Sequence, residues 1–124
     1  MSECLNPGEA VMLRFKNSNP PKNKICLCIC IETGTFLIIS SKPYTAAPAD
    51  SQIRIFKEEL TILEHDSYLD VSKYYDDFTE EDIRKGVAYG VHALSKSARD
   101  KIKHAVAGQG YLIKRVKNMV LNNL

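Results

Sequence analysis

Hydroxyl and ammonium groups gather at one end of a predicted hairpin. Residues 25 to 41 contain two β-rich runs around a Glu-Thr-Gly-Thr turn, which predicts a hairpin buried on at least one side. Both polar ends of this segment lie at the open end of the hairpin, away from Gly34. The residues at these ends are Lys22, Lys24, Ser40, Ser41 and Lys42. Two hydroxyls beside several cations indicate a site that handles phosphate.

The same side chains also have simpler structural interpretations. Ser40 and Ser41 can cap backbone groups at the end of a strand. Lys22 and Lys24 can belong to a solvated loop. Tyr44, which follows a proline, can stack on a base or cover the rim of the sheet. The residue types alone leave these alternatives open.

Alternation of apolar and polar residues predicts the strands that carry this site. In the first strand Val11, Leu13 and Phe15 share one face. Between the first two strands, residues 17–24 form a polar, proline-interrupted loop. We expect five short strands, at residues 9–16, 25–31, 36–41, 52–57 and 67–72.

The pattern becomes helical after residue 78. Thr79 and Asp82 form a capping box, which predicts a short helix over residues 80–87. Ser95 is an N-cap for a second helix, which Gly108 terminates. An apolar stripe from Leu112 to Val120 indicates a third helix. We therefore expect a mainly β fold with C-terminal helices (β+α): barrel strands within residues 8–72 and a helical part over residues 79–124.

Length and composition indicate a single domain over residues 1–124, of which 44% are hydrophobic. No run approaches the roughly 18 apolar residues that span a bilayer, and the first residues lack the basic start and apolar body of a signal peptide. We expect a cytoplasmic protein with no membrane partner.

The net charge of +2 is unevenly distributed along the chain. Residues 58–82 carry ten acidic side chains and one lysine, whereas residues 83–124 carry nine basic side chains and one acid. Solvated helix faces of different sign explain this division as well as an acidic or nucleic-acid partner does. Self-association of the two oppositely charged segments is a further alternative.

Three of the four cysteines alternate along the first strand of the hairpin. Cys26, Cys28 and Cys30 are expected to point to one face as reduced, buried, apolar residues. Structural zinc sites use Cys-x-x-Cys turns, and no histidine is near these cysteines in sequence. We expect no metal and no cofactor.

Two stretches resemble the PemK/MazF-like toxin family over about residues 8–107. Gly8-Glu9-Ala10-Val11 resembles the Gly-Asp-Val/Ile opening of that family's first strand. Residues 66–72 (Asp-Ser-Tyr-Leu-Asp-Val-Ser), then Gly90, Leu94-Ser95 and residues 102–106, resemble its late strand and the step into its last helix. The resemblance implies a small, half-open SH3-like barrel of about five strands, followed by two or three helices, in a homodimer.

The resemblance also implies a function. Members of the family cleave single-stranded RNA without metal, using the substrate's own 2′-hydroxyl, and an antitoxin protein silences them. The family's Arg-Pro at the start of the second strand is Lys24-Ile25 here, and its Thr or Ser at the end of the third is Ser40 or Ser41.

Lysine lacks the planar fork with which arginine binds phosphate, so we expect Arg14 or Arg54 to assist Lys24, Ser40 and Ser41 in catalysis. The residues expected to contact RNA outside the scissile phosphate are Lys22, Lys42 and Tyr44. The alternative is a catalytically silent SH3-like barrel that binds a peptide or nucleic acid through the same groove.

Overall fold

The computed structural model of the chain describes residues 5–16 and 20–124. In these residues six strands and three α-helices are present: β1 (Glu9–Phe15), β2 (Lys22–Cys30), β3 (Thr35–Ser40), β4 (Gln52–Ile55), β5 (Ser67–Asp70), α1 (Glu80–Tyr89), β6 (His92–Ala93), α2 (Lys96–Ala107) and α3 (Lys114–Asn123). Short 3₁₀ turns occupy Ala49–Ser51 and Lys57–Glu59. The fold is mainly β with C-terminal helices, as predicted.

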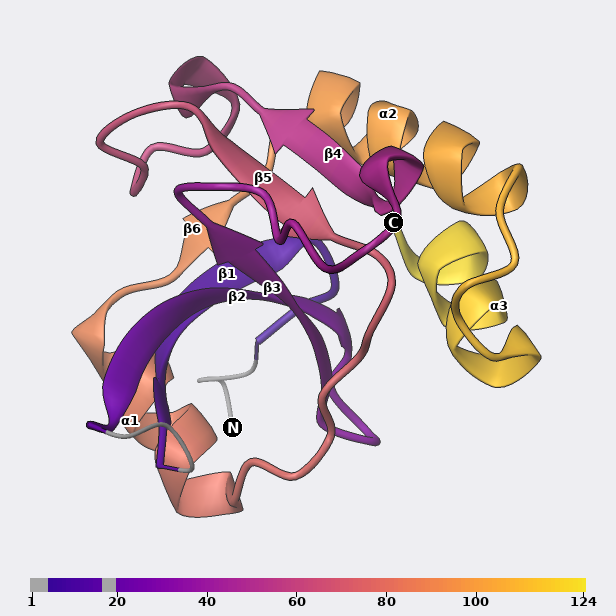
Figure 1. Cartoon of the computed structure of the whole chain (residues 1–124). Helices are drawn as coiled ribbons and strands as arrows, with labels where there is room; N and C mark the ends of the chain where they lie inside the picture. Colours follow the sequence, from indigo (N-terminus) through magenta and orange to yellow (C-terminus); the bar gives the residue numbers. More distant parts are fainter. Residues whose placement is uncertain (1–4, 17–19) are drawn as a thin grey trace.

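The strands form one antiparallel sheet in the order β4-β5-β3-β2-β1-β6. Figure 1 shows that the sheet curls strongly, so that it forms a half-open barrel. The predicted hairpin of β2 and β3 lies in its centre, and the Gly34 turn has the positive φ of 63° that glycine adopts without strain. β2 begins at Lys22, within the predicted loop of residues 17–24. Residues 17–19 of that loop lie outside the described part.

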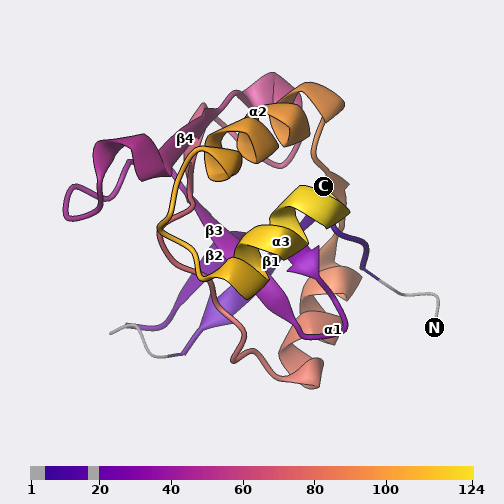
Figure 2. The same cartoon turned by 90° about the vertical axis from the view of Figure 1, so that its right-hand side faces the viewer.

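Each face of the sheet covers its own core. On one face Leu27 and Ile29 of β2 pack with residues of α2 and α3. On the other face Cys26 and Cys28 pack with Phe36 of β3, and aromatic residues of the segment after β5 close this core. Figure 2 shows α2 and α3 together on one side of the sheet and α1 at its lower end. The alternation of β2 therefore serves two cores, since neither face is solvated.

The helices begin where their sequence signals predict. The Thr79 Oγ1 accepts a hydrogen bond from the Asp82 amide at 3.0 Å, and the Asp82 carboxylate accepts one from the Thr79 amide. At the start of α2, Ser95 Oγ accepts from the Ala98 amide at 3.2 Å. Gly108 follows the last residue of α2. α1 extends two residues beyond the predicted end, to Tyr89.

The buried cysteines Cys26, Cys28 and Cys30 are free thiols. Burial raises the pKa of Cys26 and of Cys28 to about 12, so both thiols stay protonated and unreactive near neutral pH. A β-bulge shifts the register between Cys28 and Cys30, and the regular alternation ends there. Among the described helices, none is long and apolar enough to cross a membrane.

Candidate functional site

The register of the sheet brings Lys24, Ser40 and Tyr44 together. Ile25 pairs with Ile39, so Lys24 lies next to Ser40 at the open end of the hairpin. The Ser40 Oγ donates a hydrogen bond to the Tyr44 phenol oxygen at 3.2 Å. The Lys24 ammonium lies 6.0 Å from the centroid of the Tyr44 ring. Lys24, Ser40 and Tyr44 are therefore neighbours at this end of the hairpin.

Beside this cluster lies a hollow of about 450 Å³, which we call the tyrosine pocket. It is lined by Tyr44, Ala46, Ala47, Pro48, Asp70, Ser72, Lys73, Tyr75 and Tyr111. Its volume falls within the range of about 300–1,000 Å³ that is typical of small-molecule sites. Three aromatic side chains with few, localised polar groups are what a planar, polar ligand requires.

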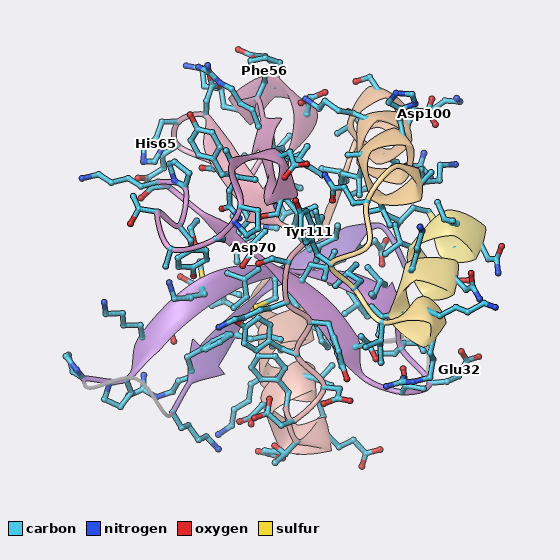
Figure 3. The ribbon with its side chains drawn as sticks, turned by 45° about the vertical axis from the view of Figure 1, so that its right-hand side comes forward. Glu32, Phe56, His65, Asp70, Asp100 and Tyr111 are labelled. Atoms are coloured by element: carbon cyan, nitrogen blue, oxygen red, sulfur yellow. The ribbon has the colours of Figure 1, made fainter. Side chains whose placement is uncertain are left out.

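The walls of the tyrosine pocket come from segments far apart in the sequence. Tyr111 lies between α2 and α3, and its hydroxyl donates a hydrogen bond to the Asp50 carboxylate. The Gln109 side-chain amide donates to the Asp50 backbone oxygen. These two bonds fix the α2–α3 connection to the loop that carries Tyr44. In Figure 3, Tyr111 and Asp70 lie close together at the centre of the molecule, whereas Phe56 and Asp100 lie at its periphery.

Two tyrosines of the pocket, Tyr75 and Tyr111, have raised pKa values. Hydrogen bonding to Asp50 raises the pKa of Tyr111 above its usual value. Burial raises the pKa of Tyr75, and the neighbouring Tyr44 and Asp70 raise it further. Neutral rings with an electron-rich face are suited to stacking and to contacts with cations.

Two further hollows are linked to the tyrosine pocket by shared lining residues. Tyr75 also lines the second, of about 260 Å³, where Phe15 and Phe78 lie. The second hollow shares Arg14, Lys16 and Asp82 with the third, of about 370 Å³. The third is lined in addition by Met12, Asn23, Lys85, Gly86 and Tyr89. We call the three hollows together the aromatic groove, because each is lined by aromatic and basic side chains.

The two candidate arginines lie apart from Lys24 and Ser40. Arg54 is on β4, where its guanidinium pairs with the Asp66 carboxylate at 3.1 Å and lies 5.4 Å from the Phe56 ring. Arg14 pairs in register with Asn23, one residue from Lys24, and so points to the opposite face of the sheet. It lines the second and third hollows instead. Neither arginine lines the tyrosine pocket.

The remaining predicted contacts lie at the same end of the hairpin. Lys22, Ser41 and Lys42 are exposed there, beyond the ends of the paired part of β2 and β3. Ser41 follows the last residue of β3 and Ser40 is half-buried. Of the two serines, Ser40 is therefore the one with a fixed partner. No group of three His, Cys, Asp or Glu side chains suited to a metal ion occurs in the described part of the chain.

The sequence interpretation missed Asp70, Tyr75 and Tyr111. Tyr75 reaches the site because its backbone forms an isolated bridge with Phe36, at 2.8 and 2.9 Å. Comparison of the chain with protein-family models, curated proteins and solved structures finds no match. The PemK/MazF-like assignment therefore stays a prediction, and function has to be argued from the chemistry of the groove.

Proposed function

We propose that this protein binds single-stranded RNA in the aromatic groove. The observation that carries the proposal is that three hollows, linked by shared lining residues, each contain aromatic and basic side chains. Tyr44 stands at one end with Lys24, Tyr75 lies between the first two hollows, and Tyr89 stands at the other end beside Lys85. Tyr89 is 80% exposed, so its ring is accessible to a base.

The chemistry of a single strand matches this succession. Unpaired bases stack on aromatic rings at about 1–3 kcal/mol for each base, largely independently of sequence. The phosphates between the bases attract the ammonium and guanidinium groups that alternate with the rings. A duplex keeps its bases stacked inside and offers the rings nothing to bind. Single strands should therefore bind better than duplexes.

Fluorescence anisotropy with a labelled single strand of about ten nucleotides tests the proposal. Wild-type protein should bind the single strand at moderate salt and bind a duplex of the same sequence more weakly. Tyr44→Leu should lower the affinity about tenfold, because one stacking surface is lost. Phe56→Ala is the matched control, since Phe56 is an exposed aromatic residue outside the groove. Equal affinity for the single strand and the duplex would contradict the proposal, and so would an unaffected Tyr44→Leu variant.

Metal-independent cleavage of the bound RNA, as in a toxin under the control of an antitoxin, is a second candidate function. The cluster of Lys24, Ser40 and Tyr44 favours it. In such a reaction the substrate's 2′-hydroxyl attacks the adjacent phosphorus, the bond to the 5′-oxygen breaks, and the products carry a cyclic phosphate and a 5′-hydroxyl. The Lys24 ammonium and a serine hydroxyl would stabilise the charge on the phosphate oxygens. The guanidinium forks of Arg14 and Arg54 lie elsewhere, so binding is the stronger candidate.

Incubation of purified protein with labelled RNA separates the two candidates. Cleavage should persist in a chelator, and both Ser40→Ala and Ser41→Ala should slow it by at least about tenfold, while Lys24→Ala weakens cleavage and binding together. Binding without any cleavage would eliminate the second candidate and leave the first intact. Cleavage that a chelator abolishes would contradict the metal-independent mechanism.

A further inference from the structure

One buried carboxylate lines the tyrosine pocket. Asp70 is only 3% exposed, and its Oδ1 accepts three hydrogen bonds. The donors are the Gln52 side-chain amide at 3.0 Å, the Ser72 amide at 2.8 Å and the Ser72 hydroxyl at 2.6 Å. Across residues 5–16 and 20–124, no hydrogen bond ends on the second oxygen, Oδ2. Because Asp70 lines the tyrosine pocket, we take Oδ2 as the carboxylate oxygen that is open to a ligand there.

A ligand that fills the pocket displaces water from this oxygen. A charged oxygen that loses water without gaining a hydrogen bond destabilises the complex more than a neutral oxygen does. A ligand that carries an N–H group avoids this cost when it binds. The Asp70 Oδ2 atom is therefore a recognition element for a donor on whatever occupies the pocket.

The direction of the free oxygen is fixed before a ligand arrives. Gln52 donates to Asp70 through its Nε2 atom, and its Oε1 atom accepts from the Tyr44 amide at 3.0 Å. The side chain that orients the carboxylate thus also holds the loop with the stacking ring of Tyr44. Because the Tyr44 backbone and the Asp70 carboxylate share Gln52 as a partner and both residues line the pocket, a base stacked on Tyr44 would approach the carboxylate.

We propose, on the basis of the function proposed above, that Asp70 makes the tyrosine pocket selective for a base with an exocyclic amino group, and hence for cytosine over uracil. The cytosine N4 amino group donates to a carboxylate oxygen. Uracil carries the O4 acceptor at the same position, and two acceptors facing each other repel. Since the two pyrimidines are otherwise nearly the same size and shape, stacking does not discriminate between them.

The Asp70→Asn substitution tests this selectivity almost isosterically. Its side-chain oxygen can still accept from Gln52 and Ser72, while its amide nitrogen replaces Oδ2 and changes the pocket from acceptor to donor. Wild-type protein should bind oligo(C) about tenfold more tightly than oligo(U), and Asp70→Asn should abolish or invert this ratio. The ratio is the measured quantity, because loss of a negative charge strengthens binding of every RNA alike.

Asp66→Asn is the matched control, since it removes the same charge from an aspartate that pairs with Arg54 and does not line the pocket. The control should keep the wild-type ratio. A second ligand series needs no variant: oligo(N4,N4-dimethyl-C) lacks the N4 hydrogens and should bind wild-type protein as weakly as oligo(U) does.

The outcomes separate this inference from the function on which it rests. Equal, groove-dependent binding of oligo(C) and oligo(U) would overturn the selectivity and leave RNA binding intact. The selectivity would also be overturned if folded Asp70→Asn protein kept the wild-type ratio of oligo(C) to oligo(U) affinity. Undiminished binding of the dimethylated oligomer would likewise overturn it. Failure to bind any of these single strands would overturn both proposals.

Discussion

Lys24 occupies a place where its charge contributes in two ways. At 6.0 Å from the Tyr44 centroid it is at the limit of a cation–π contact, which favours a position beside the pocket. The same ammonium remains available to a phosphate, since Lys24 is half-buried rather than enclosed. A lysine acts on phosphate as a point charge and tolerates variation in the position of the backbone. This behaviour suits binding of a flexible strand better than it suits catalysis at one phosphorus.

Removal of the Lys24 charge should weaken RNA binding in a salt-dependent manner. Lys24→Ala should lower the affinity for RNA at low salt. The magnitude of the slope of log K against log salt concentration should decrease by roughly 0.7, the contribution of one phosphate contact on a single strand. Lys96→Ala is the matched control, because Lys96 is an exposed lysine at the start of α2. Equal slopes for the two variants, measured by anisotropy over a salt series, would exclude Lys24 from the phosphate contacts.

Among individual residues, the sequence predicted those of the hairpin and missed those that other segments of the chain bring to the site. Lys24 and Ser40 are neighbours in one hairpin, so turn geometry alone places them together. Asp70 and Tyr75 arrive through strand β5 and the segment after it, a pairing that local patterns do not specify. The pairing of Arg54 with Asp66 depends on side-chain geometry, which spacing does not reveal.

At the scale of elements, helix α1 packs against the edge of β1 through a glycine. A Cβ atom at Gly86 would lie 2.8 Å from the Met12 carbonyl oxygen and 2.9 Å from a Leu13 methyl carbon. The absence of a side chain therefore allows the helix to approach the strand backbone. This approach positions Tyr89 and Lys85 beside Arg14 in the third hollow.

Replacement of Gly86 should accordingly destabilise the fold. Gly86→Ala would gain about 1 kcal/mol of helix propensity, but the clash with a backbone oxygen should outweigh it, for a net loss of about 2 kcal/mol. Gly110→Ala is the control, because no atom lies within 4 Å of its added Cβ. Urea denaturation measures both, and a Gly86→Ala protein as stable as wild type would contradict the packing.

Glu59 connects the turn after β4 to helix α2. Its carboxylate accepts hydrogen bonds from the Phe56 amide at 2.9 Å, the Lys101 ammonium at 3.0 Å and the Ser97 hydroxyl at 3.0 Å. Burial alone would raise the pKa of Glu59, but the bond from the Phe56 amide and those from Lys101 and Ser97 outweigh it, so that the pKa is lowered below 4.5. A carboxyl group whose pKa is lowered by folding stabilises the fold at a pH above its unfolded-state pKa. This stabilisation is lost as the pH falls through the folded-state pKa.

The Glu59→Gln variant should show this contribution directly. At pH 7 it should be less stable than wild type by about 1–2 kcal/mol, because a charge-assisted hydrogen-bond acceptor is replaced by a neutral one. The difference should shrink as the pH falls below about 4.5, the ordinary value of the group. Urea midpoints over a pH series provide the measurement; a difference that stays constant down to pH 2 would contradict the assigned role.

For the whole molecule, periodicity predicted the class of fold more completely than its details. Alternation gave five of the strands and capping signals gave the starts of α1 and α2. β6 is only two residues long, so it has no periodicity of its own. It forms by pairing with Glu9 and Ala10 at the edge of β1. The curl of the sheet likewise arises from packing on both faces, which no local pattern encodes.

The opposed charges of residues 58–82 and 83–124 predict self-association. The acidic segment of one copy can face the basic helical part of another, so we expect a homodimer with a two-fold axis. Sedimentation equilibrium at micromolar concentration should give twice the chain mass of 14.0 kDa, and salt should weaken the association. A monomer across this range would contradict the prediction without affecting the groove within one chain.

The most direct test of the account is to map where RNA binds on the isotope-labelled protein. In two-dimensional amide NMR spectra, added single-stranded RNA should shift the signals of residues that line the aromatic groove. The expected set is Arg14, Lys24, Tyr44, Asp70, Tyr75 and Tyr89. Signals from Lys96 to Lys103 on α2, a basic stretch whose residues line none of the three hollows, should stay in place. Shifts confined to α2, with the groove unchanged, would contradict the central claim.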